Sequence, residues 1–295
     1  MKSGFVAIIG RPNVGKSTLL NQLIGFKISI VSDKPQTTRK RILGVSTTEE
    51  FQMVFVDTPG IHRPGFRLNR RMMDAVYEAI RDVDVLVHMI DVSENFGKGE
   101  QFVLDLVRSS GKPSLLVLNK MDLVNKGRLL PVIDFYSKQS VYREIIPGSA
   151  LKGISMDTLQ SRIREYLPDG QPLYPSDYLT DQQERSVVGE MIREKILLHT
   201  REELPYSVAV MVEEFEEGDR EKGFVRITAS VIVEKQGQKK IIIGRSGQII
   251  KQIGVAARKE LQLFLQVRKI YLELNVKVVP GWRNREAMLD DLGVR

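Results

Sequence analysis

The distribution of apolar residues changes character near residue 170. Before it, short apolar runs alternate with longer segments in which apolar residues recur every three or four positions, patterns typical of buried strands and amphipathic helices. The predicted strands are 5–9, 42–47, 51–56, 84–92, 114–118 and 144–147, and the predicted helices are 18–24, 70–81, 99–109, 128–140 and 155–167. This alternation predicts an α/β domain built on a doubly wound, mostly parallel sheet.

After residue 170 the predicted elements follow a different order. Residues 171–182 are rich in Pro and predict a linker. The elements beyond it are a helix over 183–200, a hairpin of strands 207–215 and 224–234 around an acidic turn at 216–221, two short helices around 241–250, a helix over 254–266 and a strand over 270–279. We therefore predict domains at 1–170 and 183–295, the second of α+β type.

Composition restricts the class of protein. The chain has 295 residues, of which 42% are hydrophobic and 27% charged, as expected for a soluble globular protein of about two domains. It has no cysteine, which excludes disulfides, thiolate metal ligands and thiol nucleophiles. No apolar run approaches the ~18 residues of a membrane span and no signal peptide is recognisable, so we expect a cytoplasmic protein.

Charge is unevenly distributed in the second predicted domain. Residues 235–285 contain twelve Lys or Arg and two acids, a net charge of +10, whereas residues 201–221 contain eight acids and two Arg. A basic block beside an acidic one indicates a surface directed at a polyanion, either nucleic acid or an anionic membrane. The alternative is a solvated charged surface that binds nothing.

The sequence GRPNVGKS at 10–17 connects the first predicted strand to the first predicted helix. Gly10 and Gly15 allow the backbone to bend tightly, so that its N–H groups and the positive end of the helix converge on phosphate oxygens. Lys16 would place its ammonium on the β and γ phosphates, and the Ser17 hydroxyl would bind Mg²⁺. The candidate phosphate-binding residues here are Asn13, Val14, Gly15, Lys16, Ser17 and Thr18.

The third predicted strand ends in Asp57-Thr58-Pro59-Gly60, at the edge of the sheet where α/β proteins bind ligands. Asp57 can hold Mg²⁺ through water, and the Gly60 N–H is placed to contact a γ phosphate. Thr58 and Pro59 complete this candidate phosphate-binding segment. A polar loop at 27–41 precedes it, carries adjacent threonines at 37 and 38, and is long enough to move.

The strand at 114–118 delivers Asn119-Lys120-Met121-Asp122 to the same edge. Asp122 can accept hydrogen bonds from N1–H and the exocyclic amine of guanine, which adenine does not offer, so the predicted nucleotide is GTP. Lys120 can cover the base with its stem, and Asn119 can connect this segment to the phosphate-binding loop. Backbone N–H groups of a later turn, at Ser149, Ala150 and Leu151, can reach the guanine O6.

The basic block contains IIIGRSGQII at 241–250. Apolar residues on both sides of G-x-x-G describe two helices joined by a loop that clamps a nucleic-acid backbone, as in KH domains, and the predicted element order is that of type II. A Gly-rich helix connection without a ligand is the alternative, and the surrounding positive charge favours RNA. The candidate RNA-binding residues are Ile243, Gly244, Arg245, Ser246, Gly247, Gln248, Ile249, Lys251, Arg258, Lys277, Trp282 and Arg283.

Jointly, these segments closely resemble the Era family, bacterial Ras-like GTPases with a carboxy-terminal KH domain. The resemblance covers nearly the whole chain and rests on GRPNVGKS (10–17), PQTTR (35–39), DTPGI (57–61), NKMD (119–122), SALKG (149–153), IIIGRSGQIIKQIG (241–254) and YLELNVKVVPGWR (271–283). It implies a GTP-hydrolysing switch with GTP, GDP and Mg²⁺ as ligands, which binds the 3′ end of 16S ribosomal RNA and assists maturation of the 30S small ribosomal subunit. We expect no DNA binding, and nothing requires more than a monomer.

The resemblance also assigns a Thr of the first loop to Mg²⁺ and the γ phosphate. Thr37 and Thr38 are both candidate metal ligands beside Ser17 and Asp57, and Thr38 is favoured. The implied catalytic set is Lys16, Thr38 and Gly60. Ras-type enzymes orient the attacking water with a Gln at the position of Ile61, so we expect slow turnover. His62 is the nearest titratable side chain, and a solvated loop residue is its simpler interpretation.

Two alternative functions stay open from the sequence. One is an RNA-binding assembly chaperone in which the nucleotide has a structural role and hydrolysis is incidental. The other uses the basic block for a loose, peripheral association with the cytoplasmic face of the inner membrane.

Overall fold

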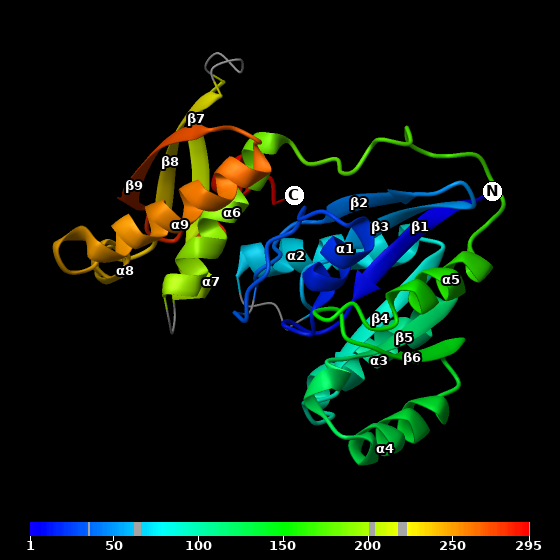
Figure 1. Cartoon of the computed structure of the whole chain (residues 1–295). Coiled ribbons are helices and arrows are strands. Elements are labelled where there is room, and N and C mark those ends of the chain that lie inside the picture. The colour runs from blue at the N-terminus through cyan, green and yellow to red at the C-terminus, as the bar shows by residue number, and fades with distance from the viewer. Residues whose placement is uncertain (35, 62–65, 201–203, 218–222, 295) are drawn as a thin grey trace. The chain divides into compact units, whose positions relative to one another are not determined.

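The computed structural model describes residues 1–34, 36–61, 66–200, 204–217 and 223–294. The chain divides into two compact units (Figure 1). The first comprises 1–29, 38–64 and 69–181, and the second comprises 30–37, 65–68 and 182–295. Two short segments from the first part of the sequence therefore belong to the second unit.

The first unit is built on a six-stranded sheet of order β2-β3-β1-β4-β5-β6. Neighbouring strands pair in parallel except β2, which is antiparallel to β3. The strands are apolar because both faces of the sheet are covered, and the structure confirms the predicted mostly parallel sheet. They are β1 (Lys2–Ile9), β2 (Ile42–Thr47), β3 (Phe51–Asp57), β4 (Val85–Asp91), β5 (Ser114–Asn119) and β6 (Glu144–Pro147).

Helices cover both faces of this sheet (Figure 1). Successive side chains of a strand point to opposite faces, so Ile8 packs with α1 and α5 whereas Ile9 packs with α2 and α3. A separate cluster joins α4 to the inner strands β4 and β5. The helices are α1 (Lys16–Ile24), α2 (Arg67–Asp82), α3 (Lys98–Ser110), α4 (Lys126–Ser137) and α5 (Met156–Tyr166).

Most of the predicted linker lies along the edge strand β2. The Val45 N–H donates to the carbonyl oxygen of Leu179 at 2.9 Å, and the Thr180 hydroxyl donates to that of Leu43 at 2.6 Å. The rings of Tyr174 and Tyr178 stack with centroids 4.9 Å apart. These contacts place residues 171–181 in the first unit, because the segment covers an otherwise unpaired sheet edge.

The second unit has a three-stranded sheet of order β7-β8-β9. β7 and β8 pair antiparallel and β8 and β9 pair in parallel, so the structure confirms the predicted α+β unit. Its main elements are α6 (Glu184–His199), β7 (Ala209–Glu217), β8 (Phe224–Val233), α8 (Gln236–Ile243), α9 (Gln248–Phe264) and β9 (Lys269–Val278). Among the described residues, the short helices not predicted as separate elements are α7 (Leu204–Ser207), η3 (Arg245–Gly247), η4 (Trp282–Asn284) and α10 (Glu286–Asp291).

One boundary in the second unit was wrong. The short helix predicted before residue 250 and the helix predicted over 254–266 form the single helix α9. Gly254 is buried inside it and packs without strain, since a Cβ there would meet no atom closer than 3.7 Å. Most of the predicted acidic turn at 216–221 lies outside the described residues. None of the described helices combines the length and the apolar character needed to cross a membrane.

Candidate functional site

The loop after β1 is shaped by Gly15 and Lys16. Gly15 has a φ of 103°, and a Cβ at this position would lie 2.4 Å from Nδ2 of Asn119, so a larger residue does not fit. Lys16 is buried, and its Nζ donates to the carbonyl oxygen of Arg11 at 2.9 Å. Burial lowers the pKa of the Lys16 ammonium to about 8. The loop therefore holds a cation at the amino end of α1.

The remaining predicted phosphate-binding residues of this segment lie beside Lys16. Asn13 has a φ of 64° and so helps to turn the loop. Val14 is buried, and Ser17 and Thr18 occupy the first turn of α1.

Asp57 is fully buried at the end of β3, where its Oδ2 meets three hydroxyl groups. Ser17 Oγ donates to it at 2.7 Å, Ser29 Oγ at 3.2 Å and Thr38 Oγ1 at 3.4 Å. Burial raises the pKa of the Asp57 carboxyl. Its Oδ1 is buried and has no hydrogen-bond partner among the described residues, an arrangement that a bound cation would relieve. Carboxylate and hydroxyl oxygens are the ligands Mg²⁺ prefers, so this cluster fits that ion.

The structure distinguishes the two candidate threonines. Thr38 Oγ1 lies 2.7 Å from Ser17 Oγ, within the cluster around Asp57. Thr37 Oγ1 instead donates to the carbonyl oxygen of Lys34 at 2.6 Å. The first unit includes Thr38 and the second includes Thr37. The geometry therefore brings only the second of the two threonine hydroxyls to the candidate metal ligands.

The segment after β3 lies against the phosphate-binding loop. A Cβ on Gly60 would lie 2.7 Å from Cα of Pro12, so glycine is required for this close approach. The Ile61 N–H donates to the carbonyl oxygen of Gly10 at 3.1 Å. The position of Gly60 therefore depends on the position of the phosphate-binding loop, and both segments can contact the same phosphate.

The residues on either side of Gly60 have different side-chain environments. Thr58 is buried and donates through Oγ1 to the carbonyl oxygen of Ile8 at 2.8 Å, and Pro59 is buried next to it. Ile61 is 3% exposed and carries no polar group to orient a water. His62 lies outside the described residues.

The guanine-binding candidates gather where β5 and β6 end. Asn119 Nδ2 donates to the carbonyl oxygen of Val14 at 2.6 Å, and its Oδ1 accepts from the Ala150 N–H at 2.9 Å. Asp122 is exposed in the short helix η1 (Met121–Leu123). Ser149 is buried and Leu151 is exposed beside Ala150. A carboxylate and backbone N–H groups thus lie at one edge of the sheet, as recognition of guanine requires.

Asp91 and Ser29 are site residues that sequence reasoning missed. Lys120 has a φ of 63°, and its Nζ lies 2.6 Å from Asp91 Oδ2, an ion pair that fixes the lysine stem. Although burial opposes it, hydrogen bonds from Lys120 and Ser93 lower the pKa of the Asp91 carboxyl. Asp91 is the last residue of β4, as Asp57 is the last residue of β3, and this position in the sequence could have identified it as a site residue. Ser29 lies in a polar loop, and no sequence pattern distinguishes it from its neighbours.

Within the second unit, α6 forms hydrogen bonds with residues 31, 36 and 37. Ile30 is part of the hydrophobic core of this unit. Glu194 is 2% exposed, and its Oε1 accepts from the Val31 N–H at 2.8 Å. Arg193 is 1% exposed and donates to the carbonyl oxygens of Gln36 and Thr37. The sequence signalled this only weakly, through three adjacent charged residues at 193–195 between apolar residues of the helix.

The G-x-x-G segment forms a tight exposed turn between α8 and α9. Gly244, Ser246 and Gly247 have φ angles of 74°, 52° and 76°, all in the left-handed region. A Cβ on Gly247 would meet no atom within 4 Å, so the backbone here is open to another chain. Arg245 and Ser246 are exposed. On or beside α9, Gln248 and Lys251 are exposed and Ile243, Ile249 and Arg258 are half-buried.

Two predicted RNA contacts require correction. Trp282 is fully buried and its Nε1 donates to the carbonyl oxygen of Ser207 at 2.9 Å, so its ring is a core element and cannot stack on a base. Arg283 Nη2 pairs with Glu234 Oε2 at 2.5 Å, and its guanidinium lies 3.9 Å from the ring centroid of Phe66. Lys277 is exposed, but it forms an ion pair with a neighbouring acid, Glu213.

Comparison with protein families matches both units. Residues 5–120 match the family described as 50S ribosome-binding GTPase, and residues 203–283 match the KH domain. The fold and the site define a P-loop GTPase domain followed by a KH domain.

Comparison with individual proteins extends over the whole chain. The chain is 45% identical to GTPase Era of Halothermothrix orenii over 294 residues, which cover 100% of this chain and 99% of that protein. It is 47% identical to GTPase Era of Geotalea uraniireducens over 292 residues, 99% of this chain and 97% of that protein. The chain belongs to the Era family of GTPases.

Two solved structures are similar over the full length. One is Aquifex aeolicus Era, a variant bound to GDP and AlF4⁻, with a TM-score of 0.94. The other is Era in complex with MgGDPNP and nucleotides 1506–1542 of 16S ribosomal RNA, with a TM-score of 0.95. Each is 43% identical and covers 100% of this chain, which covers 99% of each of them.

Proposed function

We propose that this protein is a GTP-hydrolysing switch that binds 16S ribosomal RNA near its 3′ end and assists assembly of the 30S subunit. The observation that carries the proposal is the exposed G-x-x-G turn within the strongly basic block at 235–285, in the same chain as a guanine-nucleotide site. The similar Era structure that contains nucleotides 1506–1542 of 16S ribosomal RNA supports this choice of RNA.

In the nucleotide site, we assign roles according to the positions of the side chains. The ligands are GTP or GDP and Mg²⁺, with Ser17, Thr38 and Asp57 holding the ion, which neutralises phosphate charge during hydrolysis. Lys16 contacts the β and γ phosphates, and Gly60 offers its N–H to the γ phosphate. Asp122 recognises guanine. With Ile61 buried, no described residue near Gly60 orients the attacking water, and slow intrinsic turnover follows.

In the second unit, the turn at 244–247 clamps the RNA backbone. Gly244 and Gly247 leave two of its four positions without a Cβ atom, and Arg245, Gln248 and Lys251 supply exposed cations and a polar group around it. Trp282 and Arg283 have structural roles instead, because both are turned into the protein.

Coupling between nucleotide and RNA is proposed to run through the chain at 30–38. Thr38 contacts the candidate Mg²⁺ ligands of the first unit, while the preceding residues 31, 36 and 37 form hydrogen bonds with Arg193 and Glu194 of α6. A nucleotide that orders Thr38 therefore restricts a segment whose other end, Ile30, is packed in the core of the RNA-binding unit. The affinity of that unit for RNA then depends on whether GTP or GDP is bound.

The proposal is tested by titrating the full-length protein with an RNA copying nucleotides 1506–1542 of 16S ribosomal RNA. The titration is done with a GTP analogue, with GDP and without nucleotide, each at two salt concentrations. Tighter, salt-sensitive binding in the GTP form supports a switch. Equal affinity in all three states contradicts coupling, and multiple-turnover phosphate release that disappears in Lys16→Ala rules out a purely structural nucleotide.

The basic surface could also bind an anionic membrane through electrostatic attraction. The RNA proposal is favoured because the G-x-x-G turn is a motif that binds a nucleic-acid backbone, and electrostatic attraction to lipid does not require it. We propose a cytoplasmic monomer. Sedimentation with anionic vesicles in the presence of excess competitor RNA distinguishes the two: binding that survives the competitor supports peripheral membrane association. Analytical ultracentrifugation tests the monomer.

A further inference from the structure

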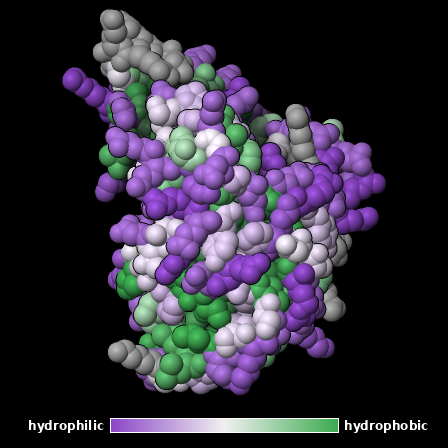
Figure 2. Space-filling view, turned by 90° about the vertical axis from the view of Figure 1, so that its right-hand side faces the viewer, coloured by the Kyte–Doolittle hydropathy of each residue, from purple (hydrophilic) through white to green (hydrophobic). Residues whose placement is uncertain are grey.

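Hydrophilic side chains cover much of the molecular face in Figure 2, whereas a polar side chain inside the protein requires an explanation. Ser29 is such a residue in the first unit. Its side chain is 1% exposed, and its Oγ donates to Asp57 Oδ2 at 3.2 Å. It lies outside the phosphate-binding loop and outside the segment after β3, so phosphate contacts do not account for its buried hydroxyl.

Asn21 of α1 fixes the backbone of Ser29. Its Oδ1 accepts from the N–H groups of Ile28 at 3.0 Å and of Ser29 at 2.9 Å, and its Nδ2 donates to the Ser29 carbonyl oxygen at 2.7 Å. One side chain thus satisfies both backbone polar groups of Ser29. Gly25 ends α1 with a φ of 73°, which turns the chain back toward Asn21. Ser29 is therefore attached to the same helix that carries Ser17.

The hydroxyl groups around Asp57 differ in what holds them. Ser17 lies in the first turn of α1, and Ser29 is attached to that helix by hydrogen bonds. Thr38 instead follows residues 30–37, which belong to the second unit. Ser17 and Ser29 therefore stay beside Asp57 whatever the conformation of residues 30–37, whereas the contact of Thr38 depends on that conformation.

The hydroxyls of Ser17, Ser29 and Thr38 donate to the same oxygen of Asp57, Oδ2. Its Oδ1 is buried and has no hydrogen-bond partner among the residues that the structure describes. Asp57 is fully buried, so bulk water competes little for these hydrogen bonds. The donors therefore fix the orientation of the carboxylate and leave Oδ1 available to a cation.

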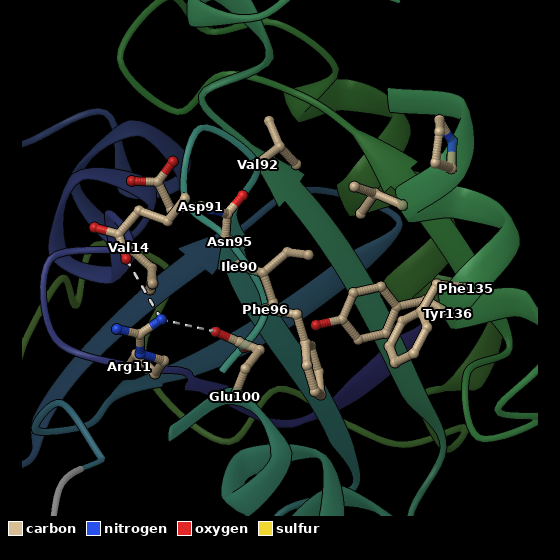
Figure 3. A pocket seen from close by; sticks show the side chains of 13 residues that line it. Arg11, Val14, Ile90, Asp91, Val92, Asn95, Phe96, Glu100, Phe135 and Tyr136 are labelled. Atoms are coloured by element: carbon tan, nitrogen blue, oxygen red, sulfur yellow. Dashed lines mark ion pairs between the residues drawn. The ribbon is translucent and has the colours of Figure 1, made fainter. Parts of the chain in front are cut away.

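A different set of contacts holds the phosphate-binding loop from the side of α3. Arg11 Nη1 lies 3.4 Å from Glu94 Oε2 and 3.6 Å from Glu100 Oε2, and Figure 3 shows the pairing of Arg11 with Glu100. These ion pairs contribute no hydrogen-bond donor to Asp57. They therefore offer a comparison in which the loop loses a contact and the carboxylate of Asp57 keeps its donors.

We propose that Asn21 and Ser29 are positioning residues that orient Asp57 for Mg²⁺ in both nucleotide states. The inference rests on the proposed function, which assigns Mg²⁺ to Asp57 and the ordering of Thr38 to GTP. When Thr38 moves away in the GDP form, the Ser29 hydroxyl still donates to Asp57, because Asn21 holds it on α1. The GDP complex therefore keeps its affinity for Mg²⁺, and the ion in turn slows GDP release.

Ser29→Ala tests this in the full-length protein. The substitution removes one donor to Asp57 and leaves no buried donor unpaired. Mn²⁺ takes the same oxygen ligands as Mg²⁺, so EPR can measure its dissociation constant in the GDP complex and in a GTP-analogue complex. We expect this constant to rise about tenfold in both complexes. GDP release at limiting Mg²⁺ should be faster, and GDP affinity in excess EDTA unchanged, because the hydroxyl acts through the ion.

Three further variants serve as comparisons. Ser114→Ala removes a buried hydroxyl that donates to the carbonyl oxygen of Lys112 at 2.9 Å, at the start of β5. Glu94→Gln weakens the ion pairing of the loop in Figure 3. Both should change Mn²⁺ affinity less than about twofold, because Asp57 keeps its donors. Thr38→Ala should weaken Mn²⁺ more in the GTP-analogue complex than in the GDP complex.

A double-mutant cycle tests whether Asn21 acts through Ser29. Asn21→Ala frees the Ser29 backbone and should by itself weaken Mn²⁺ about tenfold. Added to Ser29→Ala, it should weaken Mn²⁺ by less than about twofold more, because the hydroxyl that it positions is already gone. Fully additive effects would overturn the pair. Thermal denaturation shows whether each variant folds, and Ser29→Ala alone decides the proposal if Asn21→Ala does not.

Unchanged or tighter Mn²⁺ binding in Ser29→Ala would overturn the proposal. If that variant only lost thermal stability, the hydroxyl would serve the buried carboxylate and not the ion. A loss confined to the GTP-analogue complex would overturn the role in both states. Equal effects of Thr38→Ala in the two complexes would instead count against the proposed switch and leave the role of Ser29 standing. RNA is absent from these measurements, so their outcome does not depend on the proposed RNA binding.

Discussion

Asn119 Nδ2 donates a hydrogen bond to the carbonyl oxygen of Val14 at 2.6 Å. The same side chain accepts from the Ala150 N–H at 2.9 Å, so one amide connects the phosphate-binding loop to the turn on the guanine side. Both hydrogen bonds are buried, and neither backbone group could be satisfied by water if the amide were removed. The Asn119 side chain therefore links the backbone that binds phosphate to the backbone that binds the base.

Asn119→Ala should weaken GTP and GDP alike, by tenfold or more, and leave the preference for guanine unchanged. Because two buried backbone groups lose their partner, the free energy of unfolding should also fall by about 2–4 kcal/mol. Calorimetric titration and chemical denaturation measure the two effects. Asn125→Ala, which removes an exposed helix cap on α4, should cost about 1 kcal/mol and leave nucleotide affinity unchanged. Normal nucleotide affinity in Asn119→Ala would contradict the linkage.

Asp122→Asn should change base preference. Its exposed carboxylate only accepts hydrogen bonds, whereas an amide can also donate to the additional carbonyl of xanthine. We expect GTP affinity to fall by ~100-fold or more and xanthosine triphosphate to become the better ligand. Competition against a fluorescent nucleotide measures both affinities. An unchanged ranking of the two nucleotides would show that guanine is recognised elsewhere.

Nucleotide affinity should depend on pH through Lys16. Burial lowers the pKa of its ammonium to about 8 in the free protein, and phosphate charge favours the protonated form. Binding above this pKa therefore requires uptake of a proton. We expect the GDP dissociation constant to rise about fourfold between pH 7.0 and 8.5. In Lys16→Arg, which stays charged, affinity should be lower and flat over this range; a flat profile in the unmodified protein would contradict the prediction.

Arg193→Met should reduce coupling between nucleotide and RNA. The substitution keeps an apolar stem in the buried position and removes the donors to the carbonyl oxygens of residues 36 and 37. We expect the ratio of RNA affinities in the GTP and GDP forms to fall toward one. Arg185→Met is the matched control, because this arginine of α6 donates to the carbonyl oxygens of Val212 and Glu213 instead. Equal loss of coupling in both variants would mean that α6 acts only through stability.

The parts of the site that consist of contiguous sequence motifs could be predicted from the sequence. The phosphate-binding loop, the residues after β3 and the tetrapeptide after β5 each follow a strand, and a parallel sheet brings the ends of its strands to one edge. Chain order alone was therefore enough to place Lys16, Asp57 and Asn119 near one another. It also gave the order of elements in both units.

Contacts between distant segments could not be predicted in this way. Glu194 and Val31 are 163 positions apart, and no sequence pattern in either segment predicts that the two are in contact. The adjacent threonines at 37 and 38 differ only in what the fold places beside each hydroxyl. Trp282 stands in a basic, polar stretch that favours exposure, yet its ring is fully buried and its Nε1 donates to the carbonyl oxygen of Ser207. Such outcomes depend on tertiary packing.

Gly247→Asp should abolish or strongly weaken RNA binding and leave the fold intact. A Cβ here meets no atom within 4 Å, and Asp tolerates a φ of 76° better than most residues, so the cost in stability should be about 1 kcal/mol. A negative charge beside the RNA backbone should then lower affinity at least tenfold. Gly244 is a poorer choice, since a Cβ there would lie 2.6 Å from Ile249 Cγ1 and would distort the turn.

Gly111→Asp is the matched control for this variant. Gly111 also has a positive φ, 65°, with nothing within 4 Å of a Cβ, but it caps α3 in the first unit. Thermal denaturation should therefore report similar small losses in both variants, and GTP binding should be normal in both. Only Gly247→Asp should lose affinity for the RNA that copies nucleotides 1506–1542. Equal RNA affinity in the two variants would place the RNA contact outside the turn at 244–247, and the exposed basic residues along α9 would then be the surface to substitute next.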